Sequence, residues 1–104
     1  MIIVNTQEIA GKKITETISV VKGSSVRAKW LGKDILAGLK SLVGGELTQY
    51  KELLDEARDA ATERMKKEAE KLGADAIVNV HFMTATIAQG ASEILVYGTA
   101  VKLK

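Results

Sequence analysis

The stretch from about Glu46 to Leu72 constrains the fold most, because its apolar side chains recur at the spacing of one long helix. Acidic side chains dominate its first half and its later part is richer in basic ones, an order that complements the helix dipole. Gly73 then predicts the helix end. A helix with one continuous apolar face must lie against another layer of the structure. That face consists of Leu47, Tyr50, Leu54, Ala57, Ala61, Met65, Ala69 and Leu72.

Other segments predict β-strands. A brief strand is expected at 2–4, and longer ones at 14–21, 76–84 and 93–101. In the first long strand, apolar and polar residues alternate with a period of two. In the last two, apolar residues occupy both faces, so neither face is expected to be fully wet. The faces expected there are Val78, Val80 and Phe82 opposite Ile77, Asn79, His81 and Met83, and Ile94, Val96 and Ala100 opposite Leu95, Tyr97, Thr99 and Val101. Gly23-Ser24-Ser25 is expected to break the first long strand. The loop around 88–92 is short enough for the last two strands to pair as an antiparallel hairpin.

A second helical pattern begins near Leu31 and ends at Gly44-Gly45. The predicted order is therefore strand, helix, helix, strand, strand. This order predicts an α+β two-layer sandwich, in which the long helix lies across a mostly antiparallel sheet.

A chain of 104 residues without proline has room for one domain and no evident linker, so we expect a single domain over 1–104. No signal sequence or membrane-length apolar run is recognisable, which makes the cytoplasm the expected location and a membrane partner unexpected. The formal charge of +2 is too small to suggest a nucleic-acid partner. Basic residues near Trp30, such as Lys22 and Arg27, lack the further aromatic residues of a stacking platform.

Metal-ligating residues are scarce. The chain has no cysteine and one histidine, His81, so one copy offers no set of soft-metal ligands. Symmetry offers a route, because His81 side chains from several copies of the chain can converge or meet a carboxylate across an interface. Glu93, on the neighbouring strand, is the candidate carboxylate. A divalent metal ion is accordingly the cofactor considered, with His81 and Glu93 as its ligands.

Glu16 and three strand residues are candidates for binding another small ligand. Glu16 shares the predicted face of Ile14 and Ile18, so we expect a buried carboxylate that needs a cation, N–H donors or water at a subunit seam. Arg58 and Arg64 are its candidate partners.

Asn79, Tyr97 and Thr99 form a possible polar pocket, although such residues are also ordinary in sheets. With Glu16, they complete the predicted ligand-binding set.

Three segments together resemble the YbjQ family. The first is Arg27 to Tyr50, which includes Val43-Gly-Gly-Glu-Leu-Thr-Gln-Tyr50. The second comprises Glu56-Ala-Arg58, Arg64-Met65 and Glu68-Ala69. The third runs from Leu72-Gly-Ala-Asp-Ala-Ile-Val-Asn79 to Glu93-Ile-Leu-Val-Tyr-Gly-Thr-Ala-Val101. The resemblance covers nearly the whole chain.

This resemblance implies a dodecin-subunit-like β-α-β-β fold with the C-terminal strand in the middle of the sheet. It also implies a homo-oligomeric ring, a pentamer, in which short extra strands help assembly. The family carries a heavy-metal-binding label, but no motif for such a site transfers to residues of this chain.

Three hypotheses for function remain open. The first is a non-enzymatic homo-oligomeric ring that binds a small ligand or heavy-metal ion where subunits meet. The second is a structural or protein-interaction ring without a small ligand. The third and weakest is an enzyme whose site is assembled between subunits from Glu16, Tyr97 and His81.

Overall fold

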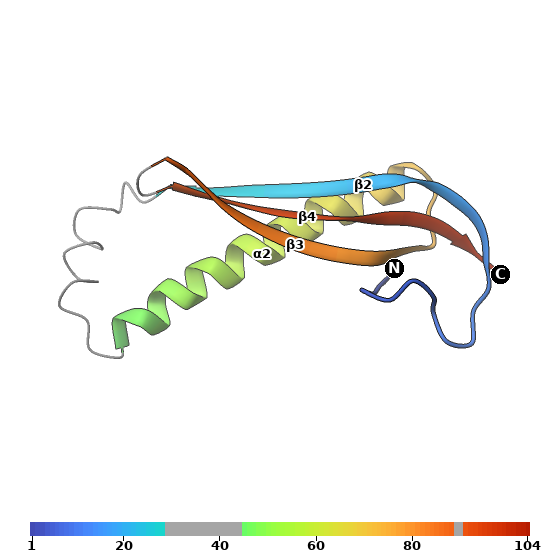
Figure 1. Cartoon of the computed structure of the whole chain (residues 1–104), viewed down its shortest axis with the longest axis horizontal. Helices are drawn as coiled ribbons and strands as arrows, with labels where there is room; N and C mark the ends of the chain where they lie inside the picture. Colours follow the sequence, from blue (N-terminus) through green and yellow to red (C-terminus); the bar gives the residue numbers. More distant parts are fainter. Residues whose placement is uncertain (29–44, 89–90) are drawn as a thin grey trace.

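The computed structural model describes the backbone of residues 1–28, 45–88 and 91–104, and the side chains of 1–26, 51–87 and 92–104. Its elements are β1 (Ile2–Ile3), β2 (Ile14–Ala28), α2 (Gly45–Lys71), β3 (Ala76–Ala88) and β4 (Ala91–Leu103). The three long strands run along the long axis of the molecule, with both chain termini at one end (Figure 1). The helix predicted from Leu31 to Val43 lies outside the described residues.

The sheet has the order β1-β3-β4-β2 and is mixed. Strands β2 and β3 both pair antiparallel with β4, whereas β1 pairs parallel with β3. The hairpin between the last two strands is therefore confirmed, as is the central place of the C-terminal strand. The outer strands of the described sheet are β1 on one side and β2 on the other.

Helix α2 spans 27 residues and packs the described part of its predicted apolar face against the sheet, except Leu72, which follows the helix and is 45% exposed. Ala57, Ala61, Met65 and Ala69 are fully buried, and Leu54 is partly buried beside them. Small alanine side chains let the helix backbone approach the strands closely. The helix runs obliquely across the sheet (Figure 1).

The main core lies between α2 and the sheet, and all three long strands contribute side chains to it. On β4, Ile94, Val96 and Ala100, which the period of two places on one face, are buried against the helix. Val21 fills the same layer from β2, and Ile77 and Val80 fill it from β3.

Strand β2 departs from the prediction in two ways. It continues through Gly23-Ser24-Ser25, because these residues pair in register with Val96, Leu95 and Ile94 of β4, so the predicted break is wrong. Register shifts also occur between Ile14 and Glu16 and between Thr17 and Ser19. Each shift inserts an extra residue and changes which side chains face the helix. As a result Val21 is buried, whereas Val20 is 66% exposed.

A second, smaller core lies on the opposite face of the sheet, near the chain termini. Ala76, Val78 and Val101 are buried there under partly buried side chains of the N-terminal segment (residues 4–13), among them Val4 and Ile9, and of Ile14 at the start of β2. This segment is tied to β3 by the bonds Val4 N–H to Ile77 O (3.0 Å) and Asn79 N–H to Thr6 O (2.8 Å). The N-terminal segment thus covers only one end of that face.

The described chain is elongated. Its radius of gyration is 16.9 Å, whereas a compact domain of this length has about 13 Å. Much apolar surface consequently stays outside the two cores. Among the described residues, α2 is too polar to cross a membrane.

Candidate functional site

The face of the sheet that points away from α2, beyond the end covered by the N-terminal segment, is called the open face here. Its side chains form rows across β2, β4 and β3, because directly paired residues point to the same side. The first row is Val20, Thr99 and Val78; the second is Lys22, Tyr97 and His81; the third is Ser24, Leu95 and Met83; the fourth is Val26, Glu93 and Ala85.

The second row, named the central row, holds the densest group of functional side chains. His81 and Tyr97 are directly paired, and their ring centroids are 5.7 Å apart with an interplanar angle of 31°. Lys22 opposes Tyr97 from the other side. Lys22 and His81 are exposed and Tyr97 is half-buried, so the row is accessible to a ligand.

Asn79 holds the imidazole of His81 in place. The Oδ1 atom of Asn79 lies 3.3 Å from Nε2 of His81. Because an amide oxygen can only accept, this contact is a hydrogen bond in the tautomer that carries its hydrogen on Nε2. In many functional histidines, a hydrogen bond to one ring nitrogen in this way orients the ring and leaves the other nitrogen for the ligand.

The position of Asn79 depends on a bulge in β3. The register shifts between Val78 and His81, and Asn79 has a φ of 53°, a left-handed conformation that asparagine tolerates better than most residues. The bulge also reverses the alternation, so Val80 faces the helix while Val78 faces the other way. The prediction that Val78 and Val80 share a face is therefore wrong.

The predicted polar pocket comes together in part. Thr99 lies two residues after Tyr97 on the same face of β4. Asn79 contacts His81, and the His81 ring in turn lies beside the Tyr97 ring. Lys22 is not among the predicted ligand-binding residues. The sequence groups it with the basic residues around Trp30, which lie mostly outside the described residues. Its spacing of two residues from Val20 is the sequence signal that places both side chains on one face of a strand.

Glu16 does not occupy the predicted environment. Its side chain is exposed rather than buried, because the register shift beside Ile14 removes it from the apolar alternation. It pairs in register with Lys102. The candidate partners are engaged elsewhere: Arg58 contacts Asp55 at 3.0 Å, and Arg64 donates to the backbone carbonyl of Ser24. Within one chain, Glu16 is also far along the sheet from Tyr97 and His81.

His81 and Glu93 lie on the same face but do not meet in one copy of the chain. His81 pairs with Tyr97, whereas Glu93 pairs with Ala85. At about 3.3 Å per residue, the four positions from Tyr97 to Glu93 separate these rows by about 13 Å. Among the described residues, no three His, Asp or Glu side chains cluster at metal-binding distance. The described residues of one chain therefore do not fit a heavy-metal centre.

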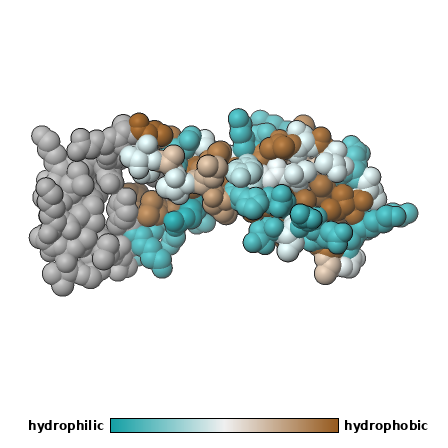
Figure 2. Space-filling model, viewed as in Figure 1, coloured by the Kyte–Doolittle hydropathy of each residue, from teal (hydrophilic) through white to brown (hydrophobic). Residues whose placement is uncertain are grey.

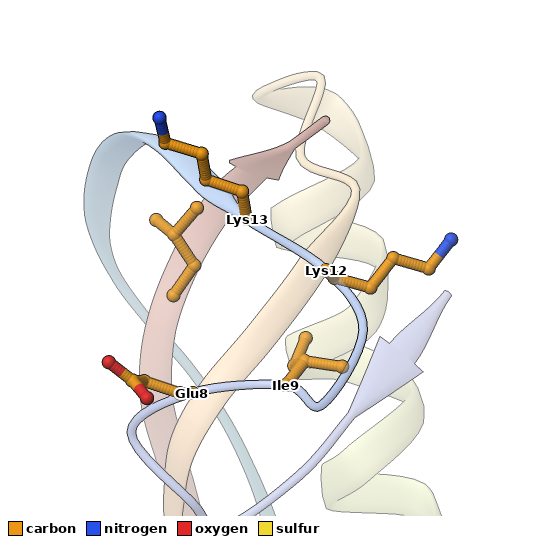
Figure 3. A pocket seen from close by; sticks show the side chains of 5 residues that line it. Glu8, Ile9, Lys12 and Lys13 are labelled. Atoms are coloured by element: carbon orange, nitrogen blue, oxygen red, sulfur yellow. The ribbon is translucent and has the colours of Figure 1, made fainter.

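A shallow hollow near the N-terminal segment has no converging polar groups. It is lined by Glu8, Ile9, Lys12, Lys13 and Ile14. The charged ends of Glu8, Lys12 and Lys13 point away from one another (Figure 3). This hollow consequently offers no concerted contacts to a ligand, and the central row remains the stronger candidate.

Comparisons with known protein sequences all point to the same family. The model of the YbjQ family, described as "Putative heavy-metal-binding", matches residues 1–104. A UPF0145 protein of Methanosarcina acetivorans is 59% identical over 103 residues, which cover 99% of this chain and 97% of the relative. A UPF0145 protein of Hahella chejuensis is 52% identical, with full coverage of both chains. Neither name states an activity.

The fold has a solved counterpart. A protein of unknown function from Pediococcus pentosaceus, assigned to the DUF74 family, superimposes with a TM-score of 0.67 at 22% identity. The match covers 100% of this chain and 98% of the other, and it concerns the fold alone. The family match over the whole length and the high identity to its relatives agree with the sequence motifs. This chain belongs to the YbjQ (UPF0145) family.

Proposed function

We propose that this protein is a non-enzymatic, self-assembling binding protein, whose copies form a ring and hold a small ligand or metal ion on the open face. The observation that carries the proposal is the distal half of β3, defined as His81–Ile87. All seven residues of this strand segment are exposed, on both faces of the sheet. Phe82, Met83 and Ile87 are 50%, 54% and 54% exposed. Large apolar residues on both sides of one strand favour a partner surface.

The partner we propose is a second copy of the chain, because the backbone is also available for pairing. On the outer side of β3, β1 and the following residues bond as far as Val80, through its N–H to Val4 O at 3.1 Å. Beyond Val80, no described strand pairs with that edge. The outer edge of β2 likewise lacks a described strand partner. Free edges of this kind favour pairing with another chain.

Pairing of β3 in one copy with β2 in the next would join two different surfaces. Such head-to-tail contacts close into rings when the rotation permits it. The pentamer implied by the family resemblance is the ring size that we propose. Arg64 already satisfies the Ser24 carbonyl of β2, so pairing would use other parts of that edge.

The binding role rests on the central row and on apolar side chains around it. Apolar patches lie between hydrophilic residues on the face seen in Figure 2. Among the described residues of the open face, no hydroxyl is hydrogen-bonded to His81, whose imidazole instead contacts the amide of Asn79. A binding function therefore fits the open face better than the interface enzyme.

Heavy-metal binding is the second candidate for the ligand. It is supported by the family description and by the exposed imidazole of His81, which Asn79 orients as metal-binding histidines are oriented by their outer partners. Since one chain does not supply enough ligands, this site would need His81 from several copies. Glu93 would reach it only from a neighbouring copy.

Thermal unfolding of the purified protein with zinc, copper, nickel and a panel of small metabolites tests the binding role. A ligand that binds the native state raises the unfolding temperature by mass action. We expect stabilisation by at least one compound, reduced in His81→Gln. The matched control is Glu70→Gln, a neutralised side chain on the exposed part of α2. Intact assembly with indifference to every compound would instead support the purely structural ring.

A further inference from the structure

We propose that the central row is a recognition site for a small molecule that carries a phosphate or carboxylate group on an apolar body. This inference specifies the ligand of the proposed binding function and rests on it. The row itself is contained in one chain, so it is testable whatever the size of the assembly.

The charge of the open face favours an anion. Lys22 is exposed at one end of the central row and His81 at the other. The two adjoining rows contain no acidic residue, since they consist of valine, threonine, serine, leucine and methionine. Glu93 stands one row further away. A free ammonium group without a neighbouring carboxylate attracts anions and repels metal cations.

Two donors of the central row, Lys22 and Tyr97, come from directly paired positions of β2 and β4. Side chains that oppose each other on paired strands have Cβ atoms about 5 Å apart. The Lys22 ammonium and the Tyr97 hydroxyl thus extend from neighbouring positions on the same face. Asn79 restrains His81, and the His81 ring lies beside the Tyr97 ring. This arrangement limits the freedom of the tyrosine, which lowers the entropic cost of binding.

The surroundings of the row supply the apolar contacts. Val20 lies in the adjoining row on one side, and Leu95 and Met83 lie in the adjoining row on the other. Val20 and Met83 are more than half exposed. A ring or short hydrocarbon attached to the anionic group would cover these side chains. An inorganic ion would make only the polar contacts and would bind more weakly.

Isothermal titration calorimetry of the full chain tests the inference with four probes: phenyl phosphate, benzoate, benzylamine and inorganic phosphate. The first two share the anionic group and apolar body, whereas benzylamine is a cation of similar shape. We expect phenyl phosphate and benzoate to bind more tightly than inorganic phosphate, and benzylamine not to bind. Equal binding of benzylamine, or no binding of either aromatic anion at millimolar concentration, would overturn the proposal.

Three variants connect the binding to the row. Lys22→Gln should weaken phenyl phosphate binding about tenfold or more, because hydrogen bonds to charged groups are the strong ones. Tyr97→Phe keeps the ring and removes only the hydroxyl, so it should weaken phenyl phosphate binding by a few-fold. Lys67→Gln, on an exposed part of α2, should change nothing. If Lys22→Gln and Lys67→Gln bind equally, the site is elsewhere and the inference fails.

Size-exclusion chromatography with light scattering on the same samples separates this inference from the proposed function. A ring that binds no aromatic anion would refute the ligand class and leave assembly standing. A monomer that binds phenyl phosphate through Lys22 would refute the ring and uphold the anion site.

Discussion

Gly23 of β2 lies directly against the backbone of Ala61 in α2. A methyl group built on Gly23 would overlap the carbonyl oxygen of Ala61 and lie 2.5 Å from the backbone nitrogen of Met65. Helix and strand thus touch without a side chain between them. This contact sets the depth at which Met65 and Val21 pack in the main core.

Gly23→Ala should therefore be strongly destabilising. Neither backbone can give way without moving the helix, so we expect a loss of about 3 kcal/mol in the free energy of unfolding, at the upper end for overpacked sites. Gly11→Ala is the control, because its added methyl meets nothing within 4 Å and only its φ of 76° is unfavourable. That variant should lose about 1 kcal/mol. Urea unfolding measures both, and equal losses would contradict the close packing.

Ser25→Ala should leave stability unchanged or raise it. The Ser25 hydroxyl is buried and has no hydrogen-bond partner among the described residues. Since an unsatisfied buried hydroxyl is costly, its removal should gain up to about 1 kcal/mol. Ser19→Ala, at an exposed position of the same strand, should stay within about 0.5 kcal/mol. A clear destabilisation by Ser25→Ala would reveal a partner for this hydroxyl.

Two substitutions at Asn79 should distinguish its role in the backbone of the bulge from its contact with His81. Asn79→Gly keeps the left-handed conformation and removes the contact with His81, so the fold should persist while ligand binding weakens. Asn79→Val forces a β-branched residue into the same conformation and should cost about 1–2 kcal/mol. Thermal unfolding compares the two. Equal stability of the glycine and valine variants would contradict a left-handed backbone conformation at position 79.

The double change Met83→Lys and Ile87→Lys tests the proposed interface. Both side chains are more than half exposed in one copy, so the fold of that copy should survive. If they are buried between copies, association should weaken about a hundredfold or more. Leu72→Lys is the control, since Leu72 is an exposed apolar residue at the end of α2. Sedimentation velocity should show smaller species for the double variant alone.

The elements with a long and uninterrupted pattern were predictable. The periodicity of α2 placed its ends within a residue of Gly45 and Lys71, and the period of two in β4 placed Ile94, Val96 and Ala100 on one face. These features follow from local spacing, which sequence displays directly. The central position of the C-terminal strand, by contrast, was implied by the family resemblance.

The candidate site was harder to predict because bulges determine it. The extra residues near Thr15, Ile18 and Asn79 change side-chain direction without a strong signal in the sequence. They expose Glu16 and turn Val80 to the helix. Lys22 gains its place opposite Tyr97 only because β2 continues through Gly23, where the sequence suggested a break.

Native mass spectrometry of the protein, purified without chelator or affinity metal, tests the central claim most directly. We expect a closed oligomer of several copies, with a pentamer as the proposed size, and binding of phenyl phosphate that Lys22→Gln reduces. A monomer at micromolar concentration would contradict the proposed ring, because the exposed side chains of Phe82, Met83 and Ile87 would then have no partner to cover them.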